Sequence, residues 1–263
     1  MESFTLSESI YLDKKIIKAQ NSIVIIDDYI KDQQLLLDIE NDESFFPKDM
    51  GSEKQQLKTG NIYHSENADI FSPWMFWDGW WNSPADTVKK RLIQAIWEDN
   101  LPCDTSELCG FEYWTRKYSP GQYLPLHLDE DTFLYEDKGK FRCPMLGAVY
   151  YAHMPVRDDQ KPGYLEMHPG RLSIDRDRVF RNKPSEDKDF ESLKDFYLKN
   201  QQPKHKRDII TYRPNRLILF DAGMLLHGTT PSGENSERYI VGINVWHKLE
   251  PPTGYEDKTF YFE

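Results

Sequence analysis

The chain has 263 residues, of which 38% are hydrophobic and 14% aromatic, so it can bury the core of one large domain. Its formal net charge of −11 disfavours general binding to nucleic acids, because an acidic surface repels phosphates. No run of about 18 apolar residues is present, so we expect no membrane-spanning helix. The first residues lack an apolar signal core, and the spacing of Cys103, Cys109 and Cys143 is not typical of disulfides, so we expect a cytoplasmic protein with free thiols.

The first part of the chain, residues 1–109, is predicted to be α-rich with some strand. Residues 22–27 form a short β-branched apolar run, which indicates a buried strand. The segment after it predicts a helix with one apolar face, made by Ile30, Leu35, Leu36 and Ile39. A second helix is predicted to start at Ser83-Pro84, with an apolar stripe through Val88, Leu92, Ile96 and Trp97.

Between these helices, residues 71–81 (FSPWMFWDGWW) contain six aromatic side chains. We interpret them as core between a helix and a sheet, and the alternative is an aromatic wall that contacts a substrate. The spacing of Trp74, Trp77 and Trp80 would also fit the apolar stripe of a buried helix.

From residue 110 the pattern changes to short strands separated by turns rich in Pro, Gly and Asn. The strand-like segments are residues 110–119, 145–154, 163–172, 208–223 and 238–248. This spacing predicts a mainly β fold with flanking helices, in which residues 110–250 form a double-stranded β-helix, or jelly roll. A densely charged interruption at 175–208 predicts an inserted amphipathic helix over one mouth of the sheets. We expect one domain over residues 1–263.

A metal site is predicted from the stretch YLPLHLDED. If this stretch is extended, His127 and Asp129 point to one face, because alternate residues of a strand share a side. His227, which follows the apolar segment RLILFDAGMLL, is the best candidate for a third ligand. Two histidines and one carboxylate on one side of an ion are typical of non-haem Fe(II) oxygenases, and they leave open positions for a chelating co-substrate and dioxygen.

An anion site is predicted beside the metal. Arg238 follows His227 by eleven residues, across a turn, and an antiparallel neighbour would bring it back towards the metal. A guanidinium binds a carboxylate with two parallel hydrogen bonds, so a buried Arg238 would suit the distal carboxylate of 2-oxoglutarate. The alternative is a surface ion pair of Arg238 with Glu234 or Glu237.

With these residues in place, the sequence resembles the 2-oxoglutarate/Fe(II)-dependent oxygenases, in particular their prolyl 4-hydroxylase-like branch. The resemblance covers about residues 110–247, through KYSPGQYLPLHLD, AVYYAHM, KPGYLEMHPG, NRLILFDAGMLLHGTTP and SERYIVGINVW. The residues 22–36 resemble the strand–helix lead-in of that branch. The departures are a slightly longer turn between His227 and Arg238, the insertion at 175–208 and the aromatic segment 71–81, and all three concern the substrate.

The resemblance implies Fe(II) bound by His127, Asp129 and His227, with 2-oxoglutarate and O₂ as co-substrates. Hydroxyl contacts to 2-oxoglutarate would come from Tyr118, Tyr151 and Thr229. The implied reaction is hydroxylation of an amino-acid residue in a peptide or protein, or of a free amino acid, with release of succinate and CO₂.

Two other functions stay open at this point. One is a non-catalytic β-sandwich that binds a metal or a partner. The other is an oxygenase of the nucleic-acid demethylase type, but that resemblance would require a second arginine six residues after Arg238, where this chain has Asn244. A homodimer is also open. We interpret Glu130 and Asp131 as solvated loop acids, and a set of arginines near the insertion as either a solvated face or an attractor for an acidic substrate: Arg171, Arg176, Arg178 and Arg181.

Overall fold

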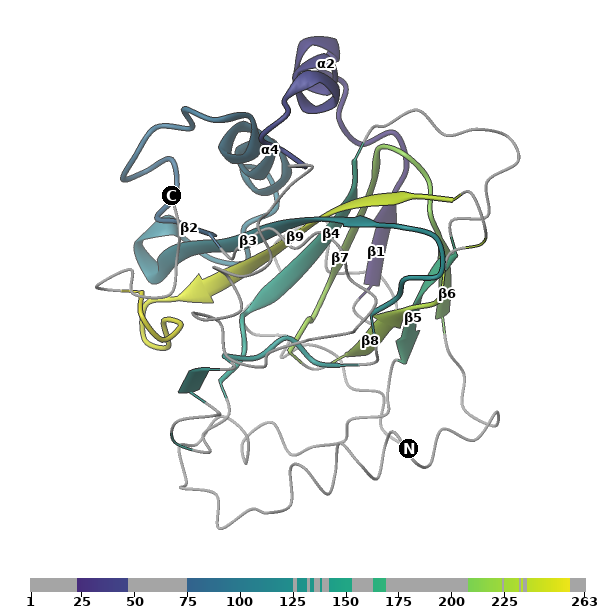
Figure 1. Ribbon diagram of the computed structural model, residues 1–263. Helices are drawn as coiled ribbons and strands as arrows, with labels where there is room; N and C mark the ends of the chain where they lie inside the picture. Colours follow the sequence, from purple (N-terminus) through teal and green to yellow (C-terminus); the bar gives the residue numbers. More distant parts are fainter. Residues whose placement is uncertain are drawn as a thin grey trace, which may run out of the picture.

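The computed structural model describes residues 23–46, 75–124, 127–131, 133, 134, 138, 142–152, 163–168, 208–223, 225–231, 233 and 236–255. Two antiparallel sheets dominate this part of the chain, and two helices accompany them. Figure 1 shows both helices on one side of the large sheet and the small sheet on the other side. The predicted insertion at 175–208, except Asp208, and the arginines beside it lie outside the described residues.

The large sheet has six strands in the order β1-β7-β4-β9-β3-β2. In chain order these are β1 (Ile23–Ile26), β2 (Met75–Trp77), β3 (Leu108–Tyr118), β4 (Leu146–Tyr151), β7 (Arg216–Phe220) and β9 (Arg238–His247). The small sheet has the order β6-β5-β8, formed by β5 (Tyr164–His168), β6 (Asp208–Thr211) and β8 (Leu226–Thr229).

The strand order is that of a jelly roll. The inner four strands of the large sheet, β7-β4-β9-β3, face the small sheet, and an isolated bridge of His127 to His227 extends the small sheet beyond β8. From β3 onwards, with the His127 bridge counted between β3 and β4, consecutive strands therefore alternate between the two sheets, apart from β5 and β6, which is the pattern of two wound Greek keys. The predicted fold class is confirmed, and among the described residues its eighth strand is represented by the bridge at His127.

The first 109 residues contribute to the same sheet as the rest. Strand β1 pairs with β7, and β2 pairs with β3, so both edges of the large sheet come from the N-terminal part. The helix α2 (Gln33–Asn41) begins after Asp32, whose side chain accepts hydrogen bonds from the amides of Gln34 and Leu35.

The second helix begins later than predicted. The helix α4 spans Val88–Trp97, and the hydroxyl of Thr87 caps it by accepting from the amide of Lys90. The predicted start at Ser83-Pro84 is wrong, because a capping hydroxyl three residues before a free amide outweighs the preference of proline for a first helical turn. Between the helix and the first long strand lies a short 3₁₀ turn, Thr105–Glu107.

Each face of the large sheet is buried by a different partner. On the outer face, α2 and α4 bury Leu36, Ile39, Leu92 and Ile96 against alternate residues of β3, β4, β7 and β9, such as Val241 and Ile243. On the inner face, the other residues of the same strands pack against the small sheet, such as Tyr118, Tyr151 and Ile240 against Leu165 and Met167. The inner face also carries the polar groups described below.

The aromatic segment is core, as interpreted from the sequence. Phe111 lies at its centre, with the rings of Trp77, Trp80, Trp81 and Trp97 at centroid distances of 5.9, 5.7, 5.7 and 6.3 Å. Residues 75–77 form β2, so the alternative of a helical stripe is wrong for this stretch. Residues 71–74 lie outside the described residues.

All three cysteines are free thiols, as predicted. Neither helix described here is long and apolar enough to cross a lipid bilayer.

Candidate metal centre

The two predicted histidine ligands are paired directly through their backbones. The amide of His127 donates to the carbonyl of His227 at 2.8 Å, and the amide of His227 donates back at 2.9 Å. This reciprocal pair places the imidazoles side by side, with ring centroids 4.3 Å apart. Two residues on, the amide of Asp129 donates to the carbonyl of Ala222 at 2.9 Å, which anchors the backbone of the third candidate ligand.

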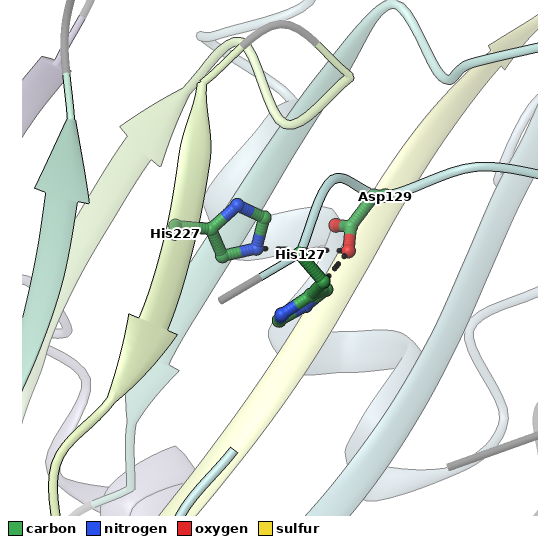
Figure 2. A group of neighbouring side chains, drawn as sticks. All are labelled: His127, Asp129 and His227. Atoms are coloured by element: carbon green, nitrogen blue, oxygen red, sulfur yellow. Dashed lines mark ion pairs between the residues drawn. The ribbon is translucent and has the colours of Figure 1, made fainter. Parts of the chain in front are cut away.

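The three side chains converge on one point, as Figure 2 shows. Oδ1 of Asp129 lies 3.4 Å from Nε2 of His127 and 3.6 Å from Nε2 of His227. One ligand atom from each residue lies within 4.8 Å of the others. Ligands that share an ion at about 2.1 Å, at right angles, would be about 3 Å apart, so the triad fits one metal ion after small side-chain adjustments. Among the described residues, no other group of three metal-binding side chains gathers in this way.

The protonation of His227 suits metal binding. Its Nδ1 lies 2.8 Å from the carbonyl of Leu225, an acceptor, so the Nδ1 carries the proton and the lone pair of Nε2 faces Asp129. Burial lowers the pKa of His227 to about 4, assisted by the charge of His127, while Asp129 acts in the opposite direction. The imidazole is therefore neutral at neutral pH, the state in which it can bind a metal.

Asp129 is ionised in the same conditions. Burial favours its neutral form, but the two imidazoles beside it, through electrostatic attraction and hydrogen bonding, hold its pKa below the usual value. Its side chain is 11% exposed, against 9% for His127 and 5% for His227. The site thus combines one carboxylate with two imidazole nitrogen donors in surroundings that exclude most water, which is a donor set suited to Fe(II).

Arg238 is buried on the inner face, 1% exposed, directly opposite Tyr118 in the pairing of β3 and β9. Its Nη2 donates to the carbonyl of Gln122 at 3.1 Å and to Oγ1 of Thr229 at 3.3 Å. Its Nε and Nη1 are buried, and neither has a hydrogen-bond partner in the described part of the chain. Burial also lowers the pKa of Arg238. A buried cation with two unused donors fits an anionic ligand such as a carboxylate.

The predicted alternative, a surface ion pair of Arg238, is wrong. Glu237 is bound instead by Lys117, with Oε1 2.6 Å from Nζ, and by the hydroxyl of Tyr239 at 2.6 Å. Glu234 lies outside the described residues. Because Arg238 is 1% exposed, its guanidinium belongs to the interior rather than to the surface of the turn.

The remaining predicted contacts surround Arg238. Its Cζ lies 4.8 Å from the ring centre of Tyr118, and Tyr151 belongs to the same buried cluster as Tyr118. The hydroxyl of Thr229 accepts from the amide of Leu124 at 2.8 Å as well as from Arg238. Thr229 thereby holds the guanidinium in place, and a direct contact of these three residues with a ligand stays a prediction.

Sequence reasoning misjudged or missed several polar groups near the triad. Asp131 was interpreted as a solvated acid, but it is 4% exposed and accepts from the amide and the hydroxyl of Thr253 at 2.7 and 2.8 Å. Glu112 and Asn244 were not predicted as part of the site, yet both lie on the inner face of the large sheet and contact each other. The signal for Glu112 was its even spacing from Tyr118 along one strand.

Comparison with known proteins gives matches to solved structures alone: no family model and no curated protein matches the chain. A prolyl-4-hydroxylase from Pseudomonas putida is 14% identical, with 86% of this chain and 93% of that one covered, at a TM-score of 0.49. A prolyl hydroxylase from Trichoplax adhaerens, in complex with a hypoxia inducible factor peptide, is 13% identical, with 87% and 85% covered, at a TM-score of 0.49. HygX from Streptomyces hygroscopicus, with nickel and 2-oxoglutarate bound, is 16% identical, with 88% and 84% covered, at a TM-score of 0.43.

At these identities and TM-scores, the chemistry of this chain has to be inferred from its own side chains.

Proposed function

We propose that this protein is a non-haem Fe(II) oxygenase that uses 2-oxoglutarate and O₂ and hydroxylates an amino-acid residue in a peptide or protein, or a free amino acid. The observation that carries the proposal is the convergence of Asp129 with both histidines, at 3.4 and 3.6 Å, in the same interior as a buried arginine with unused donors. A structural role alone explains neither a buried imidazole pair around a carboxylate nor a buried guanidinium whose Nε and Nη1 meet no acid among the described residues.

Each side chain has a task that its surroundings support. His127, Asp129 and His227 would hold Fe(II), and Arg238 would bind the distal carboxylate of 2-oxoglutarate through Nε and Nη1. When bound, the iron and 2-oxoglutarate supply the oxidation: one oxygen atom of O₂ enters succinate as CO₂ is lost, and the other enters the substrate.

The protein also shapes the interior in which this happens. Phe220 packs its ring edge-on against His227, with centroids 4.7 Å apart, and so shields one side of the imidazole from water. Thr229 and the carbonyl of Gln122 orient the guanidinium before any ligand arrives. Such preorganisation lets a small diacid bind without reordering the site.

The test is an anaerobic titration of the apoprotein with Fe(II) and then 2-oxoglutarate, followed by oxygen. We expect a visible charge-transfer band from the chelated keto acid, and succinate after oxygen is admitted. Asp129→Ala should abolish the band, whereas His247→Gln should keep it, because His247 is outside the triad and its Nδ1 accepts from the amide of Leu249.

Three results would separate the proposal from its alternatives. Metal binding without any affinity for 2-oxoglutarate would favour the non-catalytic metal-binding protein. Succinate formation stimulated by methylated single-stranded DNA, and by no peptide or amino acid, would favour the demethylase type. No metal binding at all by the wild-type protein would overturn the proposed function.

A further inference from the structure

The side of β3 that faces the small sheet carries two side chains that stay partly exposed. On the other side of this strand, Phe111 and Tyr113 are buried under the helices. Alternate residues of a strand share a side, so Glu112 and Trp114 point towards the small sheet. Both are only partly buried, although every other residue of Leu108–Arg116 is buried. A space that can hold a ligand or solvent therefore adjoins both side chains.

This space lies at one end of a row of residues that leads to the metal centre. Glu112 opposes Asn244 on β9, and Asn244 opposes Gly147 on β4. Gly147 in turn opposes Phe220 on β7, so these four residues form one row across the sheet. At the far end of the row, the ring centroid of Phe220 lies 4.7 Å from that of His227. Neighbouring strands are about 4.8 Å apart, so the row is about 14 Å long, and a molecule held at Glu112 can also reach the metal centre.

Glu112 is a carboxyl group in a fixed orientation. Its Oε2 accepts from Nε1 of Trp246 at 3.1 Å and from Nδ2 of Asn244 at 3.5 Å, whereas Oε1 accepts from neither. Both donors are neutral, so they orient the group without supplying a positive charge. Burial raises the pKa of Glu112 to about 8, and the nearby acids Asp131 and Asp129 act in the same direction. A positively charged ligand would stabilise the carboxylate form, so it is the kind of ligand that this group favours.

Trp114 provides an aromatic face beside this carboxyl group. It opposes Gly242 on β9, and a Cβ built on that glycine would lie 2.2, 2.3 and 2.7 Å from Cε2, Cζ2 and Nε1 of the indole. Because these neighbouring ring atoms are at similar distances, the ring lies across the glycine and turns its opposite face to the interior. The face of an indole attracts cations, so Trp114 and Glu112 favour the same kind of ligand.

The charges on this side of β3 run from negative to positive along the strand. Glu112 is at the end that leads to the metal centre. Arg116, four residues on, has its Cζ 5.0 Å from the ring centre of Tyr118, which opposes Arg238. A cation is therefore attracted to the Glu112 end and repelled from the Arg116 end.

We propose that Glu112 and Trp114 bind a cationic group of the substrate, such as the ammonium of a lysine or the guanidinium of an arginine, while another part of the substrate reaches the metal centre. The proposal rests on the proposed function, because it requires a substrate that approaches the metal. It goes beyond it by naming the chemical class of that substrate, a peptide or amino acid with a positively charged side chain. This class is opposite in charge to the acidic substrate that the arginines at 171–181 would attract.

The experiment measures, by calorimetry, the binding of blocked peptides to the protein loaded with Ni(II) and 2-oxoglutarate, so that no turnover occurs. The peptides share one sequence and differ only in the central residue, which is lysine, arginine, norleucine or glutamate. Norleucine has the carbon chain of lysine without its charge. We expect the lysine or the arginine peptide to bind about 10- to 100-fold more tightly than the norleucine peptide, the range of one hydrogen bond between charged groups. The glutamate peptide should bind most weakly.

Substitutions at both positions assign the preference to these residues. Glu112→Gln keeps an oxygen acceptor for Trp246 and Asn244 and removes the charge, so the cationic peptide should bind no better than the norleucine peptide. Trp114→Leu should weaken binding of the cationic peptide by about 2- to 30-fold, whereas Trp114→Phe keeps an aromatic face and should retain most of the affinity. Stabilisation by Ni(II) and 2-oxoglutarate shows that each variant is folded, and the two Trp114 variants decide if Glu112→Gln does not fold.

A matched control removes the same charge elsewhere. Glu98 is exposed at the end of α4, on the helical side of the large sheet (Figure 1), where its Oε1 accepts from Nε2 of Gln94 at 3.4 Å. Glu98→Gln changes the net charge by the same amount as Glu112→Gln, and it should leave the preference for the cationic peptide unchanged. This separates recognition by Glu112 from a general attraction of cations to an acidic protein.

The outcomes distinguish the inference from the proposed function. If Ni(II) and 2-oxoglutarate stabilise the wild type but it binds no peptide, or binds the norleucine or glutamate peptide as tightly as the cationic ones, the inference fails and the proposed function stands. If Glu112→Gln or Trp114→Leu keeps the full preference for the cation, the cation is bound elsewhere and the role of that residue is wrong. If the wild type binds neither Ni(II) nor 2-oxoglutarate, both the inference and the proposed function are overturned.

Discussion

Replacing Arg238 by methionine is the most direct test of the anion site. Methionine is similar in length and apolar, so it fills the same space on the inner face and removes only the charge and the donors. Arg238 is 1% exposed and meets two neutral acceptors, Gln122 and Thr229, so its charge is poorly compensated without a ligand. We expect the ligand-free variant to unfold at the same temperature as the wild type or higher, because burying an unpaired charge costs free energy.

Binding of 2-oxoglutarate should respond in the opposite direction. A hydrogen bond between charged partners contributes about 1.5–3 kcal/mol, so the two unused donors Nε and Nη1 together contribute about 3–6 kcal/mol. At about 1.4 kcal/mol for each tenfold change, the affinity should fall by about 10²- to 10⁴-fold.

The assay is thermal unfolding with Ni(II) in place of iron, so that no turnover occurs, at increasing concentrations of 2-oxoglutarate. A ligand at 100 times its Kd stabilises the folded state by about 2.7 kcal/mol, and this stabilisation should vanish in Arg238→Met over the range that saturates the wild type. The matched control is Arg116→Met. Arg116, on β3, is buried like Arg238, and its Cζ lies 5.0 Å from the ring centre of Tyr118. That control should keep most of the ligand-induced shift.

The reasoning is refuted if Arg238→Met responds to 2-oxoglutarate as the wild type does. It is also refuted if Arg116→Met alone loses the response, since the diacid would then be bound by the other guanidinium.

Further outcomes concern the ligands and the core. With a chelator present, the free energy of unfolding should fall by about 3 kcal/mol at most as the pH drops from about 6.5 to 4. The reason is that the pKa of His227 is lowered in the folded state, so the unfolded chain binds the proton more readily. In urea titrations, His227→Gln should flatten this dependence on pH. Asp129→Ala should weaken metal binding, followed by calorimetry, by more than the 10- to 100-fold typical of a lost partner of a ligand. Leu92→Ala, at a fully buried site on α4, should cost about 2–5 kcal/mol in urea unfolding, whereas Leu37→Ala, 49% exposed on α2, should change it by less than about 0.5 kcal/mol.

The elements with strong local patterns were predictable from the sequence. The apolar face of Ile30, Leu35, Leu36 and Ile39 is buried as expected, although the helix itself begins only at Gln33. The alternating strands after residue 110 were recognisable because side chains of a strand repeat every two residues. The start of α4 was misplaced because proline and a capping threonine compete within a few residues.

Groups whose environment depends on distant parts of the chain were not predictable. Asp131 looked solvated because its neighbours are acids, but residue 253 returns to cover it. Glu112 and Asn244 meet through the register of β3 and β9, and a register cannot be read from either strand alone, since one-residue shifts exchange the faces.

The amino-acid order alone was enough to predict a chemistry: an imidazole and a carboxylate two positions apart, a second imidazole 100 residues later and a guanidinium eleven beyond it. Those residue types have few common uses together, so their identity pointed to a metal and a diacid. Whether they meet was decided only by folding, through the bridge of His127 to His227 and the burial of Arg238. Such contacts form because many weak interactions across both sheets are satisfied at once, and no local stretch of the chain contains that information.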